Sequence, residues 1–352
     1  MALLGEFARP SGLGMGVRLV RAALDGMGVP TVALDADVRN KLPPPGMPLL
    51  LHVNPPSLPL ALLQQDRALL RGRYVVGMWN WELPVVPDSW RIGLGFVHEL
   101  WVSSRFTADA MAGLLPADGR IGLRVVSYPL AVVPPVPAAM DRAAFGLPAD
   151  ALVVLVSFNL ASSYVRKNPL AALVAFRAAF GDRADRVLVL KVSHPAHFPE
   201  DFAELRAAVA GAANIRLETR TMAPGEVHAL TACADIVLSL HRSEGFGLVP
   251  AEAMLLGRPV VATGWSGNMD FMDAESAILV PFRLVPAHDP RGVLEAPGAM
   301  WAEPDVAAAA AALRRLADDG AYRRALGARG QQRARAALGA GSLAAAMAGL
   351  PR

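Results

Sequence analysis

The sequence predicts an α/β protein built from two doubly wound domains, each with a parallel sheet and crossover helices. Short apolar runs of strand length alternate with helical stretches in the first half of the chain. The same alternation starts again after a proline-rich break. We therefore expect a first domain over 1–135, a Pro-rich linker over 136–150, a second domain over 151–318 and a basic helical tail over 319–352.

The segments of the first half have either the 3.6-residue apolar spacing of a helix or the length of a buried strand. Helices are expected over 14–28 and 60–72, and strands over 48–53, 74–79 and 100–104. Five prolines between Pro129 and Pro148 exclude a long helix at the start of that segment and are typical of an interdomain linker.

The second half restarts the same rhythm. Strands are expected over 152–158, 186–192, 214–218, 235–240 and 258–263, and helices over 168–181, 201–211, 225–234 and 248–257. Two α/β domains of similar size joined by a linker leave a cleft between them, which is a common place for a small-molecule site.

Composition excludes several classes of protein. Cys233 is the single cysteine, so we expect no disulfide framework and no cysteine-based metal site, as in a cytoplasmic protein. We expect no signal peptide, because the first residues have neither a basic start nor a long apolar core, and no membrane span, because no stretch approaches eighteen apolar residues. The net charge of +3 is not concentrated on one basic segment of the domains, so a nucleic-acid partner is not expected.

The tail is the basic exception, because it contains no acid from Gly320 onward. Its arginines are Arg323, Arg324, Arg329, Arg333, Arg335 and Arg352. One interpretation is a solvated helix face opposite an alanine-rich packing face. The other is a basic helix on the inner face of the cell membrane, and a tail that crosses back to the first domain is a further expectation.

Lysine is rare in this chain, since only Lys41, Lys167 and Lys191 occur among 34 basic residues. A compact ammonium group suits phosphate binding as a point charge. Lys167 follows Arg166 at the start of a helix after the first strand of the second domain, where a diphosphate would fit. Lys191, at the end of the next strand, is a weaker candidate. Ordinary surface charge or an ion pair is the alternative for each.

Glycines mark two further candidate loops. Gly12, Gly14 and Gly16 precede a helix but lack the dinucleotide spacing, so a plain turn and a ligand contact at Gly14 are both open. The turn SEGFG lies between a strand and a helix and presents Glu244.

That turn also places backbone amides at a helix start, where they can hold an anion. Glu252 follows on the same helix, and two separate carboxylates can accept hydrogen bonds from sugar hydroxyls. A helix-terminal acid and an interior salt bridge are the alternative interpretation. The amides belong to Phe246, Gly247 and Leu248.

The stretch SEGFGLVPAEAMLLGRPVVATGWSGNMDFM resembles the nucleotide-sugar site of family 4 retaining glycosyltransferases (glycosyl transferases group 1) of the bacterial polysaccharide type. The marks are two glutamates separated by seven residues, the EGFGL turn, the AEAM helix, the GRPVVAT strand and the SGN loop. The resemblance extends to VRKNPLAALVAFRAAF and WAEPD, and more loosely to GMWNWELP and ELWVSSRFTADAM.

The resemblance implies two facing Rossmann-like domains of the GT-B type with a cleft between them. It implies that Glu252 holds the ribose hydroxyls, Glu244 contacts the donor sugar, and Lys167 binds the diphosphate. The amides of Phe246 to Leu248 would hold sugar or phosphate oxygens. No metal and no cofactor is expected, because basic residues and helix amides can neutralise the leaving diphosphate.

One departure concerns the position where much of that family has an arginine, since Ala161 stands there and Arg166 is adjacent to Lys167. Arg166 replacing it and Lys167 acting alone are both open. On the acceptor side His52 is the candidate base, with a structural histidine as the alternative. Trp79 and Glu82 lie in an aromatic loop suited to sugar stacking.

The predicted function is hexose transfer from a nucleotide diphosphate sugar to a glycan or lipid-linked acceptor, with retention and without metal. GDP-mannose is the first guess for the donor. The alternatives are an inverting or epimerase-type enzyme of the same architecture, and a non-catalytic nucleotide-sugar-binding partner in a polysaccharide assembly complex. Product configuration and donor hydrolysis would separate them.

Overall fold

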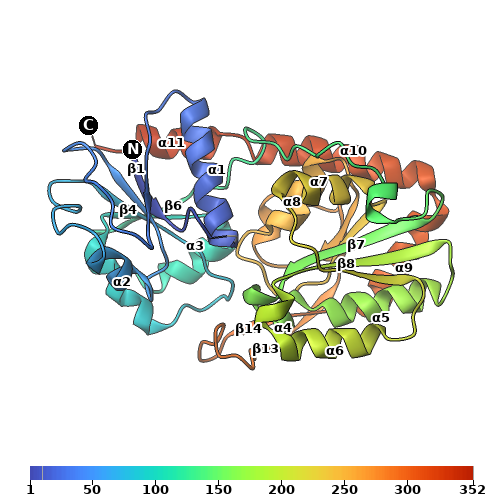
Figure 1. Cartoon of the computed structure of the whole chain (residues 1–352). Helices are drawn as coiled ribbons and strands as arrows, with labels where there is room; N and C mark the ends of the chain where they lie inside the picture. Colours follow the sequence, from blue (N-terminus) through green and yellow to red (C-terminus); the bar gives the residue numbers. More distant parts are fainter. Residues whose placement is uncertain (10, 352) are drawn as a thin grey trace. The chain divides into compact units, whose positions relative to one another are not determined.

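A computed structural model describes residues 1–9 and 11–351, so the tail residue Arg352 lies outside the described residues. The chain forms two compact units (Figure 1). One comprises Met1–Val133, Ala296–Ala299 and the chain from Leu338 onward, and the other comprises Pro134–Glu295 and Met300–Ala337. Each holds a six-stranded parallel sheet with helices, so the predicted α/β fold class is confirmed.

The sheet of the first unit has the strand order β2-β1-β3-β4-β5-β6. β2 lies on one side of β1, and the strands from β3 to β6 follow on its other side. The strand order therefore reverses between β1 and β3. The strands are β1 (Ala2–Gly5), β2 (Val32–Asp35), β3 (Leu49–His52), β4 (Val75–Trp79), β5 (Glu99–Val102) and β6 (Gly122–Val125). The helices are α1 (Gly12–Gly26), α2 (Leu58–Leu63), the 3-10 helix η1 (Asp88–Phe96), α3 (Arg105–Ala112) and α11 (Gly341–Ala348).

One expected helix is much shorter than its apolar spacing suggests. The segment 60–72 is helical only to Leu63. The side chain of Gln65 then bonds to the loop after β2, donating to the Val38 carbonyl and accepting from the Asn40 amide. Asp66 accepts from the Ala68 amide and forms a turn. Side chains that bond to nearby backbone in this way compete with helix continuation.

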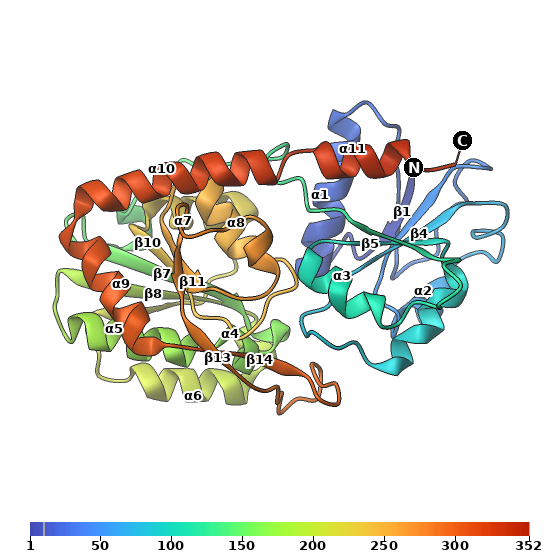
Figure 2. The same cartoon turned by 180° about the vertical axis from the view of Figure 1, so that it is seen from behind.

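The last helix of the chain belongs to the first unit. The Ala131 amide donates to the Leu338 carbonyl at 2.9 Å, and the side chain of Leu343 on α11 is fully buried. The preceding helix α10 (Gly320–Ala337) belongs to the second unit and packs on α8 (Leu248–Leu255). Figure 2 shows both helices in red from behind.

The second unit has the strand order β12-β11-β10-β7-β8-β9. Its other strands form a two-stranded antiparallel ribbon of β13 and β14. The strands are β7 (Leu152–Asn159), β8 (Arg186–Ser193), β9 (Ile215–Glu218), β10 (Ile236–Ser239), β11 (Val260–Thr263), β12 (Ile278–Val280), β13 (Phe282–Pro286) and β14 (Met300–Pro304).

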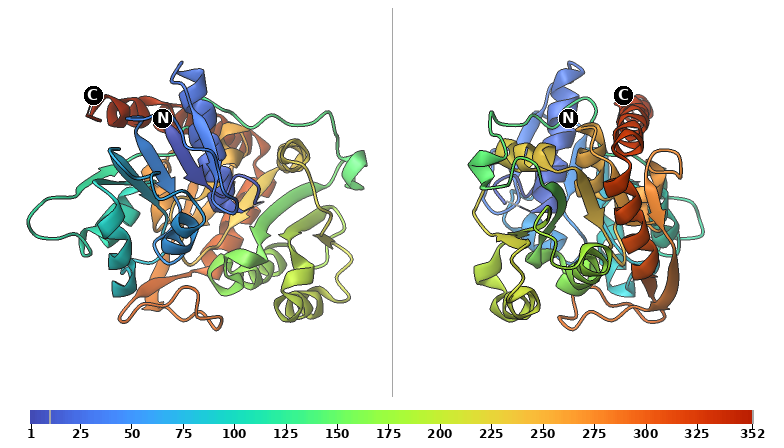
Figure 3. Two further views of the ribbon diagram at one scale, coloured as in Figure 1. Left: turned by 60° about the vertical axis from the view of Figure 1, so that its left-hand side comes forward. Right: turned by 90° about the vertical axis from the view of Figure 1, so that its right-hand side faces the viewer.

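Helices cover both faces of this second sheet, as Figures 1 and 3 show. The helices α5 and α6 lie on one face and α7 and α8 on the other. The remaining helices are η2 (Ala143–Phe145), η3 (Leu160–Ser162), α4 (Tyr164–Lys167), α5 (Pro169–Phe180), η4 (Pro195–His197), α6 (Pro199–Val209), α7 (Pro224–Cys233), η5 (Gly267–Asp270) and α9 (Val306–Asp318). Apolar side chains of β7, β8 and β10 are buried between these layers.

The strand order of the second unit reverses between β7 and β10, which are neighbours. Ligands of open α/β sheets bind in the crevice outside the carboxyl ends of the strands at such a point. The chain that follows β7 contains α4, and the chain that follows β10 contains the SEGFG turn. Among the described residues, no helix is long and apolar enough to cross a membrane.

Candidate functional site

The central group of the candidate site is Glu244 with two cations from α4. Lys167 Nζ donates to Glu244 Oε1 at 2.5 Å, and Arg166 Nη1 lies 3.3 Å from Glu244 Oε2. The carboxylate is 9% exposed and the Lys167 side chain 17%. The structure therefore brings together three of the residues that the sequence singled out, at the point where the strand order reverses.

Arg166 serves the protein in a different way from the one expected. Its guanidinium is 1% exposed and donates to the carbonyl oxygens of Ser243 and Ser162 at 2.7 and 2.9 Å. These bonds tie α4 to the loop that carries Glu244. A side chain so buried and so bonded orients Glu244, and a diphosphate contact of Arg166 stays a prediction.

The charge state of Glu244 follows from its surroundings. Burial by itself raises the pKa of this carboxyl, but the charges of Lys167 and Arg166 outweigh burial and lower the pKa to about 2. Glu244 is therefore ionised at neutral pH. An ionised carboxylate accepts hydrogen bonds only, so it suits donors such as ammonium groups and sugar hydroxyls.

The turn after Glu244 leads directly into α8. Gly247 caps the helix with φ 98°, a left-handed value that favours glycine. The first-turn amides of a helix have no intrahelical partners and can bind anions. Phe246 is 5% exposed and packs on Phe271 with ring centroids 5.2 Å apart. The packing of Phe246 thus fixes the backbone that carries the predicted amides of Phe246, Gly247 and Leu248.

A second loop, which contains Ser266 and Gly267, bonds to the backbone of Glu244. The Glu244 amide donates to Ser266 Oγ at 2.8 Å, and the Gly267 amide donates to the Glu244 carbonyl at 2.9 Å. A Cβ at Gly267 would lie only 2.1 Å from the Gly245 carbonyl oxygen, so this approach requires glycine. The SGN loop therefore positions the carboxylate through its main chain.

A buried histidine that belongs to none of the sequence motifs supports that loop. His241 Nε2 lies 3.1 Å from Asn268 Oδ1 and 3.3 Å from the Trp265 carbonyl, so this nitrogen carries the proton. Nδ1 then accepts from Ser239 Oγ at 3.0 Å. Burial lowers the pKa of His241. A histidine directly after a strand and close to Glu244 was the only signal in the sequence.

The backbone is strained around this site. Four non-glycine residues of the described chain have positive φ, and all follow strands β7, β8 or β11 of the second unit. Such conformations persist only where surrounding structure imposes them, and they gather at functional sites. They are Ser163 (63°), Asn168 (51°), His194 (61°) and Ser266 (81°).

Glu252 and Lys191 lie outside this group, on α8 and β8 of the second unit. Glu252 Oε1, on α8, is 3.8 Å from His228 Nε2 on α7. Burial lowers the pKa of His228, but the Glu252 carboxylate outweighs burial and raises that pKa. Lys191, on β8, is 3% exposed and donates to Ser193 Oγ at 3.2 Å. Burial lowers the pKa of Lys191, and Glu218 opposes that effect.

In the first unit His52 is buried and bonded within the protein. Its Nε2 lies 2.9 Å from Tyr128 Oη, which donates to Asn80 Oδ1 at 2.9 Å. Burial lowers the pKa of His52 to about 4, so the ring is neutral at pH 7. With no exposed surface, the ring is not placed to take a proton from an acceptor, and the structural alternative is favoured.

Two other predicted site residues of the first unit are packed or bonded within the protein, and their roles stay predictions. Trp79 is fully buried with Trp90 packed edge-on at 6.3 Å, so its ring belongs to the core and not to a sugar-stacking surface. The Gly14 amide donates to Ser11 Oγ as the cap of α1, so it is not directed at a ligand. Glu82, in the loop after β4, is half-buried and stays a prediction.

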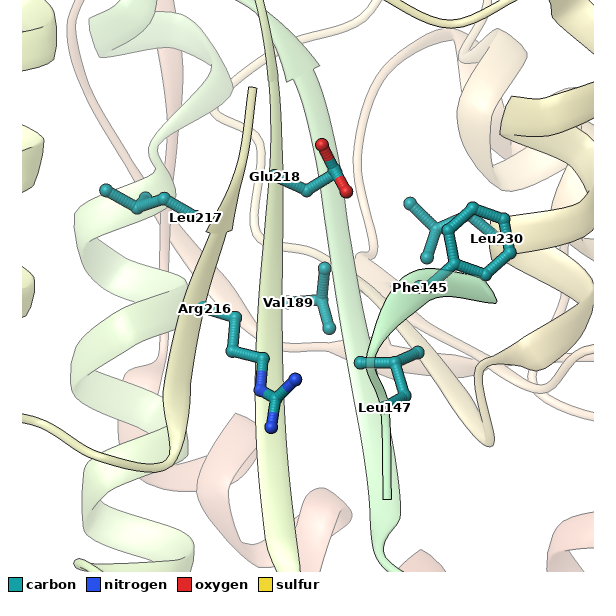
Figure 4. A pocket seen from close by; sticks show the side chains of 7 residues that line it. All are labelled: Phe145, Leu147, Val189, Arg216, Leu217, Glu218 and Leu230. Carbon is teal, nitrogen blue, oxygen red and sulfur yellow. The ribbon is translucent and has the colours of Figure 1, made fainter. Parts of the chain in front are cut away.

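A cavity of about 390 Å³ lies in the second unit beside β9 (Figure 4). Its wall includes Glu218, which is the register partner of Lys191 on β8. It contains none of the predicted site residues. Its other lining residues are Phe145, Leu147, Val189, Arg216, Leu217 and Leu230. Among the described residues, no group of three His, Cys, Asp or Glu side chains could hold a metal ion.

Comparison with known proteins places this site in context. Residues 193–319 match the family model of glycosyl transferases group 1. The chain is 30% identical over 239 residues to a D-inositol 3-phosphate glycosyltransferase of Nocardioides sp., covering 65% of this chain. The match spans 48% of that relative, about half of its length.

Solved structures are similar over nearly the whole chain. Anabaena HepE in complex with UDP and glucose has a TM-score of 0.68 at 13% identity, covering 99% of both chains. Sucrose-phosphate synthase from Thermosynechococcus elongatus has a TM-score of 0.68 at 18% identity, covering 99% of this chain and 96% of that one. At these identities the likeness establishes the GT-B fold alone.

Proposed function

Starting from residues 193–319, which carry the glycosyl transferases group 1 match, we propose that this chain is a retaining family 4 glycosyltransferase of bacterial polysaccharide synthesis. It would move a hexose from a nucleotide diphosphate sugar to a glycan or lipid-linked acceptor. The observation that carries the proposal is the Lys167–Glu244–Arg166 group at the carboxyl ends of β7 and β10.

The ion pair gives each residue a task in donor binding. Lys167 is the more exposed of the two cations. When the donor binds, its ammonium group leaves Glu244 and pairs with the diphosphate. Arg166 stays bonded and keeps the carboxylate ionised and in place. The oxygen that Lys167 releases then accepts a hydroxyl of the donor sugar. Glu252 would hold the ribose from the same helix that begins at the glycine turn.

The chemical step is a displacement on the face from which the diphosphate leaves. The acceptor oxygen forms a bond to the anomeric carbon while the bond from that carbon to the phosphate oxygen breaks. The departing phosphate oxygen takes the acceptor proton. Positioning and charge stabilisation by Lys167 and the amides of the α8 first turn lower the barrier. Because His52 is buried, this step does not depend on it as a base.

The donor is tested by binding before turnover. GDP-mannose remains the first guess, and UDP-glucose is the natural comparison because it is the ligand in a structure of Anabaena HepE. A ligand that binds the folded state alone raises the unfolding temperature by mass action. A panel of GDP-, UDP- and dTDP-sugars should therefore contain one donor that stabilises the protein at micromolar to millimolar concentration.

Transfer from that donor is then measured for wild type, Lys167→Ala and Arg183→Ala, an exposed cation of the same unit that serves as control. Loss of transfer in Lys167→Ala alone supports the proposal. A wild-type rate in Lys167→Ala would refute the diphosphate assignment. Inverted configuration in the product, read by NMR, would refute retention. Donor binding with neither transfer nor hydrolysis would support the non-catalytic alternative.

A further inference from the structure

An apolar and basic surface lies on the first unit, formed by the loop after β2 and by α2 with the turns that follow it. We call it the α2 surface. Its apolar side chains are unusually exposed for large hydrophobic residues: Leu63 (81%), Leu60 (63%), Val38 (55%) and Leu42 (47%). Its cations are Arg39, Lys41, Arg67 and Arg71, all exposed.

Hydrogen bonds make the two segments one continuous surface. Asn40 donates from its backbone and side-chain nitrogens to Gln65 Oε1 at 3.2 and 3.0 Å. Gln65 Nε2 in turn donates to the Val38 carbonyl at 2.8 Å. Leu60 and Leu63 are three residues apart on α2, so they share one face of the helix. The exposed apolar groups are therefore held together by a rigid polar frame.

The charge of the α2 surface is strongly one-sided. Within residues 38–42 and 57–72 the four cations face one acid, Asp66, which lies 3.6 Å from Arg39. The nearby Asp37 bonds to Arg9, outside the surface. Exposed leucines bordered by arginine and lysine are the chemistry of a protein face that meets anionic lipid headgroups.

We infer that the α2 surface docks the protein on an anionic lipid bilayer, with Leu60 and Leu63 entering the boundary between headgroups and acyl chains. Its cations contact the lipid phosphates. This role is independent of the proposed glycosyl transfer. It also differs from the expectation that the basic tail makes the membrane contact.

The tail is less suited to that role because three of its cations bond to the second unit. Arg329 donates to the Glu275 carbonyl at 2.7 Å, Arg323 donates to the Leu316 carbonyl at 2.6 Å, and Arg333 lies 3.3 Å from Asp273. The apolar side of α10 is buried in the same unit. Leu63, which at 81% is the most exposed large apolar side chain among the described residues, lies instead in the α2 surface.

The test is co-sedimentation of the full chain with phosphatidylcholine vesicles that contain or lack phosphatidylglycerol. Wild type should bind the anionic vesicles, and less so at high salt. The double variant Leu60→Ser/Leu63→Ser and the double variant Arg67→Gln/Arg71→Gln should each lower the partition coefficient by on the order of tenfold. All four positions are exposed or at a turn, so the unfolding temperature should not change.

Two matched controls decide the outcome. Val174→Ser/Leu284→Ser removes exposed apolar groups from the second unit, and Arg324→Gln/Arg335→Gln removes exposed cations from α10; both should bind vesicles as wild type does. The inference is overturned if wild type ignores anionic vesicles or if the tail variant loses binding while the α2 variants keep it. It is also overturned if the wild type is a dimer in solution and the only effect of Leu60→Ser/Leu63→Ser is to make it a monomer. Donor stabilisation should be unchanged throughout, which separates this result from failure of the proposed activity.

Discussion

Replacing Glu244 with Gln removes the negative charge that two cations share. In the wild type, the Arg166 guanidinium is 1% exposed and relies on this carboxylate together with two carbonyl groups. The variant keeps the shape of the side chain but leaves a buried cation without a counter-charge. Removal of one partner from a buried ion pair costs about 3–5 kcal/mol in measured cases.

The pKa gives a second estimate of the same quantity. The pKa of Glu244 falls from 4.5 to about 2 on folding, which corresponds to about 3 kcal/mol of stability at neutral pH. Because the folded pKa is the lower one, this stability is present above about pH 4.5 and is lost as the pH falls towards 2. About 2 kcal/mol of it should be gone at about pH 3.

The assay is urea unfolding of wild type and Glu244→Gln at about pH 7, 5, 4 and 3, with Glu200→Gln on the exposed face of α6 as a control. The free energies of unfolding of wild type and Glu244→Gln should differ by about 3 kcal/mol at pH 7 and by about 1 kcal/mol at pH 3. A difference that stays constant or widens on acidification would refute the assignment of the ion pair as the source of the lowered pKa.

Three further outcomes are expected. Lys167→Ala should lower transfer by on the order of a hundredfold or more. Because Arg166 still pairs with Glu244, this variant should be destabilised less than Glu244→Gln, and a loss of transfer that only follows the loss of folded protein would contradict the assignment. Gly267→Ala should lower the unfolding temperature by several degrees and abolish donor-induced stabilisation, because a Cβ there meets backbone at 2.1 Å. The control Gly341→Ala, whose Cβ meets nothing within 4 Å, should be neutral or slightly stabilising in thermal melts. The raised pKa of His228 adds stability below about pH 6.5, and this stability is lost as the pH rises through the folded pKa. In Glu252→Gln the free energy of unfolding should therefore depend less on pH across neutrality. An unchanged pH dependence would show that His228 and Glu252 are not coupled.

The part of the site that could be predicted from sequence is the part encoded locally. A buried strand, a glycine turn and a helix that starts at Leu248 follow one another within about twenty residues, and each has its own pattern. The glycine at 247 is required by its left-handed φ, so its position in the sequence already marks the turn. The strand order of the second sheet then brings α4 beside this turn.

Burial and distant partners could not be predicted in the same way. His52 is bonded to Tyr128, 76 residues further on, and nothing near His52 in the sequence indicates that contact. The sequence neighbours of Arg166 are those of a ligand-binding cation, but its bond to Ser243 spans 77 residues and no local pattern indicates it. The SGN loop is a local sequence motif, but its support by His241 depends on packing.

The membership of α11 in the first unit has a consequence for how the protein is made. Leu338 and Leu343, which complete that unit, leave the ribosome about 200 residues after Val133. At roughly 5–20 residues per second this delay is on the order of 10–40 s. During that time the second unit is synthesised up to Ala337, while the first still exposes the apolar surface that α11 covers. Nascent chains stalled before residue 338 should therefore recruit chaperones through their first unit, although that unit was synthesised first.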